Sequence, residues 1–143
     1  MGQQQLLLLV LGIVIVGLAV VVGIQAFGEN QKKANADALV NDGVRIASDA
    51  QAWALKPQAF GGPAAGEDVG DATFQDLGYE ASATDVYSNL NGIFQLSSAA
   101  AQLTIDGCSA PASGLENTVQ IVVTGTAPED IATTVDTATC SFS

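Results

Sequence analysis

The chain has 143 residues, enough for one domain plus an anchor, and a formal net charge of −11 at pH 7. All four bases lie within the first 56 residues, so the part from Pro57 onward has eleven acids and no base. A surface with that charge repels nucleic acid and anionic lipid, which argues against both as partners of the head. The chain has no histidine, the commonest metal ligand, so no zinc or haem site is expected.

The first predicted element is a long apolar run from Leu6 to Ile24 that contains no charge. As a helix it reaches roughly 28 Å, close to the hydrocarbon thickness of a bilayer. It is apolar on every face, and such a helix must be buried in lipid or among other helices. The polar residues before it lack the positive charge and the cleavage motif of a secretory signal. We therefore predict a hydrophobic helix over residues 1–28 that crosses a membrane or packs among other helices.

Residues 29–56 are predicted to continue the same helix with an amphipathic pattern. The apolar positions recur at spacings of three and four residues, at Ala36, Leu39, Gly43, Ile46, Ala50 and Trp53. Charged residues mostly lie off this stripe, and no proline interrupts the helix before Pro57. We predict that the head packs onto this stripe through Leu39, Gly43, Ile46, Ala50 and Trp53. The stripe is short and rich in small residues, which argues against a coiled coil.

Residues 57–143 are predicted to form an acidic globular domain, the head, whose first part has no regular secondary structure. Phe60 to Asp71 is rich in glycine and is expected to be a loop, followed by a polar connection over Ala72 to Tyr87 with a helical turn at Phe74–Leu77. The loop lacks the lysine and the strand-then-helix setting of a phosphate-binding loop. Its acids do not have the spacing of an EF-hand, and the sequence leaves Ca²⁺ binding there open.

The last third changes to the short, β-branched and alternating patterns typical of strands. Four strands are predicted, at Ile93–Leu96, Leu103–Ile105, Val119–Val123 and Ile131–Thr139. The turns are expected at Asn91-Gly92, Asp106-Gly107, Ser113-Gly114 and Ala127-Pro128. The predicted fold class is therefore α+β, with a long N-terminal α-helix packed on a small C-terminal antiparallel sheet.

The two cysteines, Cys108 and Cys140, have no spacing typical of a metal site. A pair of cysteines behind an N-terminal membrane segment indicates a disulfide formed in an oxidising compartment. Such a bridge would tie the second predicted turn to the last strand and fix the tail. Two free buried thiols are the alternative.

Enzymatic chemistry is not indicated. A nucleophilic triad needs a base, and without histidine the only bases are lysines on the predicted helix. No phosphate-binding loop, dinucleotide fingerprint or metal cluster is present in the sequence, and aromatic residues are few. We expect a structural protein without a cofactor or a metal.

The N-terminal segment Met1-Gly2-Gln3-Gln4-Gln5-Leu6-Leu7-Leu8-Leu9 resembles the start of a mature bacterial type IV pilin, and the layout of the whole chain is similar to that family. The resemblance in sequence is strong over about the first 30 residues. It implies that prepilin peptidase removes a basic leader and that Met1 is N-methylated. In a second register Met1 is the initiator, cleavage follows Gly2, and Leu7 becomes the fifth residue.

Two features depart from the pilin pattern. Gln5 stands where pilins usually carry a glutamate that neutralises the N-terminal ammonium of a neighbouring subunit. Its amide oxygen can accept a hydrogen bond from Met1 but supplies no charge. In the alternative interpretation, Gln3 to Gln5 are simply interfacial polar residues. The family's proline near position 22 is also missing, and Gly12, Gly17 and Gly23 are the candidates for a segment of helix that melts in the filament.

The resemblance implies a subunit that polymerises with identical copies into a pilus-like filament outside the cell. It also implies an unassembled pool in the inner membrane, an assembly ATPase and a platform protein. The residues expected to form the filament core are Met1, Gln5, Leu6, Leu9, Ile13, Val16, Val20, Ile24 and Phe27.

Two alternatives belong to other functional classes. The first is a pseudopilin of a type II secretion system, whose major subunits generally lack the C-terminal disulfide. The second is a monomeric membrane-anchored protein whose extracytoplasmic head binds a ligand or a protein. The sequence does not choose among adhesion, motility, DNA uptake and electron transfer as the role of a fibre.

Overall fold

The computed structural model describes residues 2–64, 66, 68–82, 85–138 and 142. The chain divides into two compact units, Met1–Lys33 and Ala34–Ser143. The sequence analysis expected boundaries after residues 28 and 56, whereas the second unit begins at Ala34 and therefore includes the apolar stripe from Ala36 to Trp53.

Helix α1 runs from Gly2 to Ala54, so both predicted parts form one continuous helix. It ends two residues earlier than the sequence indicated. Pro57 has a φ of −61° and a ψ of 146°, and the residue before a proline is disfavoured in the helical conformation. A short 3-10 turn, η1 (Gln58–Phe60), follows, and Gly61 closes it in the left-handed conformation with a φ of 85°.

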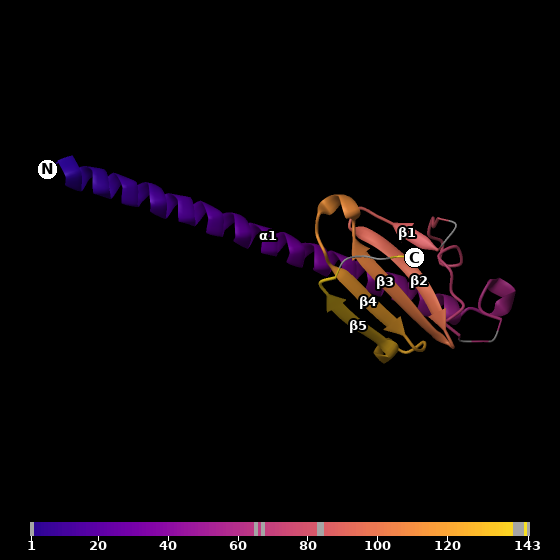
Figure 1. Cartoon of the computed structure of the whole chain (residues 1–143). Helices are drawn as coiled ribbons and strands as arrows, with labels where there is room; N and C mark the ends of the chain where they lie inside the picture. The colour runs from indigo at the N-terminus through magenta and orange to yellow at the C-terminus, as the bar shows by residue number, and fades with distance from the viewer. Residues whose placement is uncertain (1, 65, 67, 83–84, 139–141, 143) are drawn as a thin grey trace. The chain divides into compact units, whose positions relative to one another are not determined.

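Five strands form one antiparallel sheet in which neighbours in sequence are neighbours in space (Figure 1). They are β1 (Val86–Ser88), β2 (Gly92–Ala99), β3 (Gln102–Ser109), β4 (Thr118–Val123) and β5 (Ile131–Asp136). The 3-10 turns η2 (Pro111–Ser113) and η3 (Pro128–Asp130) connect the last three strands. The predicted α+β class, with a long N-terminal helix and an antiparallel sheet, is confirmed.

The turn predicted at Asp106-Gly107 is wrong. Both residues lie inside β3, and the chain reverses at Ala100 and Ala101, which have φ angles of 43° and 65°. Gly107 is needed for space, because a Cβ there would lie 2.7 Å from Cε1 of Phe94. Cys108 is therefore a residue of β3 and does not lie in a turn.

The connection expected over Ala72 to Tyr87 is less polar than predicted. Phe74 is fully buried, and Tyr87 belongs to β1, a strand that the sequence analysis missed. The rings of Phe74, Tyr79, Tyr87 and Phe94 lie in contact, with neighbouring centroids 5.0–6.4 Å apart. Three-residue strands carry too short a pattern to be recognised by alternation. At the other end, β5 stops at Asp136, and the predicted final residue, Thr139, lies outside the described residues.

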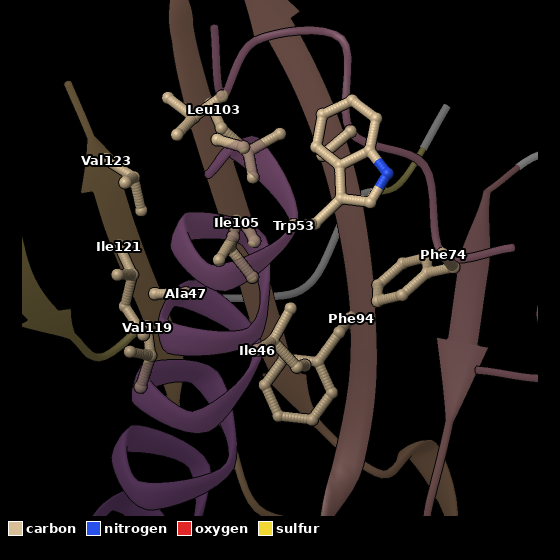
Figure 2. Close-up of a cluster of buried hydrophobic side chains, with 14 of the residues drawn as sticks. Ile46, Ala47, Trp53, Phe74, Phe94, Leu103, Ile105, Val119, Ile121 and Val123 are labelled. Atoms are coloured by element: carbon tan, nitrogen blue, oxygen red, sulfur yellow. The ribbon is translucent and has the colours of Figure 1, made fainter. Parts of the chain in front are cut away.

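The core of the second unit lies between one face of the sheet and residues 39–54 of α1. Figure 2 shows Ile46 and Ala47 of the helix directed toward side chains of β2, β3 and β4. Its buried residues are Leu39, Ile46, Ala47, Ala50, Trp53, Ala54, Val69, Ala72, Phe74, Phe94, Leu103, Ile105, Val119, Ile121 and Val123. The inward positions of β3 and β4 alternate with more exposed ones, as expected for a sheet with one covered face.

Candidate functional site

The apolar surface of the first unit is the main candidate site. Its large apolar side chains between Leu6 and Phe27 are all exposed, at 52% to 69% of their full accessibility. They surround the helix, because the run is apolar at every helical angle. Burial of one such side chain is worth about 1.5–3 kcal/mol relative to its exposed state. This surface therefore needs an apolar environment that the first unit does not itself provide.

Each expected filament-core residue that the structure describes lies on this surface. They are Gln5, Leu6, Leu9, Ile13, Val16, Val20, Ile24 and Phe27, and all are exposed. Met1 lies outside the described residues, so the predicted contact between its amine and Gln5 stays a prediction. Gly12, Gly17 and Gly23 are all helical, and beyond the neighbouring residues and backbone of the helix itself a Cβ on any of them would have no atom within 4 Å. Melting at these glycines likewise stays a prediction for the assembled state.

Helix α1 is long and apolar enough to cross a membrane, judged by its length and composition. The core helix of a soluble protein and a signal sequence can meet the same criterion, and this segment lies near the N-terminus. Unlike a core helix, however, its most apolar stretch has no buried residue. The helix thus indicates membrane association or a signal sequence.

The residues predicted to pack against the head lie in the core of the second unit. Leu39, Ile46 and Ala50 are at most 1% exposed. Gly43 is buried against β4, where a Cβ would collide with Cδ1 of Ile121. The indole Nε1 of Trp53 donates a hydrogen bond to the carbonyl oxygen of Gly61 at 2.8 Å, which holds the turn after the helix against its last residues.

A polar cluster that the sequence analysis missed joins the helix to the β1–β2 turn. Asp42 accepts hydrogen bonds from the side-chain amides of Asn89 and Asn91, both at 2.8 Å, and Asn35 donates to the carbonyl oxygen of Asn91 at 3.0 Å. The Nδ2 atom of Asn117 donates in turn to Oδ1 of Asn35 at 3.1 Å. A carboxylate that accepts from two amides fixes the position of both. This cluster aligns the stripe with the sheet.

A second polar contact, near the C-terminal end of α1, also fixes the helix on the sheet. The side chain of Gln51, only 9% exposed, donates from Nε2 to the carbonyl oxygens of Gly125 and Ala127 at 2.9 and 2.8 Å. These carbonyls belong to the connection between β4 and β5. These hydrogen bonds give two partly buried carbonyl groups a partner within the protein, so Gln51 stabilises this connection against the helix.

Tyr79 donates a hydrogen bond from its hydroxyl to Oδ2 of Asp49 at 2.5 Å. Burial, followed by the hydrogen bond to Asp49 and the charge of that carboxylate, raises the pKa of Tyr79 from 10.0 to about 12, while Arg45 acts in the opposite direction. A tyrosine whose proton is held this firmly is a structural donor at neutral pH.

Cys108 is disulfide-bonded. Cys140, its predicted partner, lies outside the described residues. Within the part of the chain that the structure describes, no three residues among His, Cys, Asp and Glu are grouped so that they could hold a metal ion. The expectation that the protein is not an enzyme remains a prediction.

Comparison of the chain with protein families, with curated proteins and with solved structures found no match.

Proposed function

We propose that this protein is a structural subunit that polymerises through its N-terminal helix into an extracellular, pilus-like filament. The observation that supports the proposal is the exposure of every large apolar side chain between Leu6 and Phe27 on a helix that continues, without a break, into the core of the second unit. The resemblance of residues 1–9 to a pilin N-terminus supports the same assignment.

The physical mechanism follows from the chemistry of the two units. Leu, Val and Ile side chains on a helix are about as well accommodated by lipid as by other helices, so leaving the membrane yields little net free energy. Assembly must then be driven, and the pilin resemblance implies an ATPase and a platform protein as the source of that work. Once assembled, the apolar helices shield one another from water, and the acidic second units face the solvent.

A monomeric anchored protein is the second candidate, because the same apolar surface is also suited to a single helix in a bilayer. It differs in what remains after detachment from the cell. A filament is released by shearing, whereas an anchored monomer stays with the membrane. A pseudopilin also stays with the cell envelope and forms no long surface fibre.

Electron microscopy of material sheared from cells tests the proposal, together with mass spectrometry of the N-terminus of the recovered chain. We expect thin, uniform fibres that consist of this protein. The recovered chain should begin at Met1 and carry an N-methyl group on its amine. A chain that begins at Gln3 would select the second register. Protein that stays in the membrane as a monomer, with no fibres, would refute the proposal.

Val14→Asp is the corresponding variant, because it places a carboxylate in the middle of the apolar surface, where Val14 is 52% exposed. An uncompensated charge inside a helix bundle is strongly disfavoured, so we expect no fibres. Val14→Leu is the matched control and should assemble normally. Fibres from Val14→Asp in wild-type amount would contradict the proposed role of this surface.

A further inference from the structure

Strand β5 forms an edge of the sheet that lacks the usual protection against pairing. It runs over six residues, Ile131–Asp136, and each pairs with β4 in an uninterrupted register, without a bulge. It contains neither lysine nor proline, the residues that commonly protect an edge. The opposite edge, β1, is only three residues long. No described strand pairs with the outer side of β5.

The register identifies the backbone groups that face outward. The N–H of Thr124 donates a hydrogen bond to the carbonyl oxygen of Asp130. In an antiparallel ladder hydrogen-bonded pairs alternate with pairs that are not hydrogen-bonded. Ala132 and Thr134 are therefore also hydrogen-bonded to their partners on β4. The N–H and C=O groups of Ile131, Thr133 and Val135 therefore point away from β4. They form a row of backbone donors and acceptors along the outer edge.

The side chains of the same three residues lie on the face of the sheet that carries the core. They are aligned with Val123, Ile121 and Val119 of β4, which are at most 2% exposed. Along β5, by contrast, every residue after Ile131 is exposed, and Val135 reaches 51%. At Val135 this face of the sheet thus presents an apolar side chain that the helix does not cover.

The charge around this edge restricts the partner. Glu129 and Asp130 precede β5, and Asp136 ends it. Arg45, one of the two bases of the second unit, lines a small hollow with Tyr79 and with Tyr87 of β1, at the opposite edge of the sheet. A second copy of β5 would bring the same acids to the contact. A segment with Lys or Arg would be attracted.

We propose that β5 is a docking edge for an extended, basic polypeptide segment of another protein, which adds to the sheet as a sixth strand. Its backbone pairs with the outward groups of Ile131, Thr133 and Val135, and its apolar side chains cover Val135. Its basic side chains lie near Glu129 and Asp136. This surface belongs to the second unit, so the inference does not depend on the proposed filament.

The test uses the full chain in micelles of an uncharged detergent and a fluorescent peptide of alternating lysine and valine. We expect the peptide to bind, with a rise in anisotropy and slower hydrogen exchange at the amides of 131, 133 and 135. Thr133→Pro removes one outward N–H and leaves the ladder with β4 intact, so it should weaken binding by roughly fivefold or more. Thr133→Val keeps the N–H and should bind like the wild type.

Two further peptides test the same pairing with the wild-type protein, so that the result does not depend on how Thr133→Pro folds. A version with N-methylated valines has the same charge but cannot pair through its backbone, and a version with glutamate in place of lysine can pair but is repelled. Both should fail to bind. Equal binding of the N-methylated peptide, or unchanged exchange at the three amides, would mean adsorption to the acidic surface and would overturn the proposal. Self-association that Thr133→Pro abolishes, without peptide binding, would overturn it in favour of a second copy.

Discussion

The two parts of helix α1 have opposite relations to water, although both are rich in apolar residues. In the first unit the large apolar side chains between Leu6 and Phe27 are all at least half exposed, whereas in the second the stripe from Leu39 to Ala54 is almost completely buried. Hydrophobicity by itself therefore does not identify the core of this protein. What distinguishes the buried part is its pattern, a narrow apolar stripe with small residues that lets the helix approach the sheet.

This difference in burial means that the second unit determines folding, whereas the first unit determines association with lipid or other chains. The second unit supplies its own partner for the stripe and does not require another molecule for its core. Between Leu6 and Phe27 the first unit buries none of its large apolar side chains, so its state depends on lipid or on other chains. Substitutions in the two parts should accordingly affect different measurements.

The largest contrast is expected from one substitution made in both parts. Ile46→Ala removes a side chain that is 1% exposed and should lower the free energy of unfolding of the head by about 2–5 kcal/mol. Ile13→Ala changes a side chain that is 65% exposed and should alter it by less than about 0.5 kcal/mol. Urea unfolding in detergent, followed by the fluorescence of Trp53, measures both. Equal losses would mean that the first unit contributes to the stability of the head.

A smaller effect is expected from the polar cluster that aligns the stripe. Asp42→Ala leaves the amides of Asn89 and Asn91 without their shared acceptor, which should lower the free energy of unfolding by about 1–3 kcal/mol. Asp37→Ala on the exposed side of the same helix is the matched control and should be close to neutral. If the two variants unfold at the same urea concentration, the cluster does not hold the helix on the sheet.

The smallest effect is expected at alkaline pH, where the free energy of unfolding of the second unit should decrease. The pKa of Tyr79 is raised from 10.0 to about 12 in the folded state. The stabilisation from its protonated hydroxyl is therefore complete below pH 10 and is lost as the pH rises from 10 to 12. Tyr79→Phe should remove this part of the pH dependence. Measurement of unfolding across that interval compares the two proteins, and identical slopes would contradict the contact with Asp49.

The long helix and its stripe were predictable because both depend on periodicity within a few turns. The position of the β2–β3 turn was not predictable, because an Asp-Gly pair has the same sequence whether the glycine forms a turn or makes space for Phe94, as Gly107 does. The polar cluster was beyond prediction, since Asn35 and Asn117 meet across 82 positions and no local pattern marks either of them. For the apolar surface, sequence identifies the residues but not the molecules that cover them.

The order of the strands has a consequence for how the head folds. Each strand pairs with the one just before it in the chain, so the sheet can grow by closing short hairpins, which is kinetically favourable. The stripe is covered later than the first hairpins form, because Gly43 packs against Ile121 of β4 and that strand begins only at Thr118. A chain leaving its ribosome therefore presents an uncovered stripe until β4 has been synthesised.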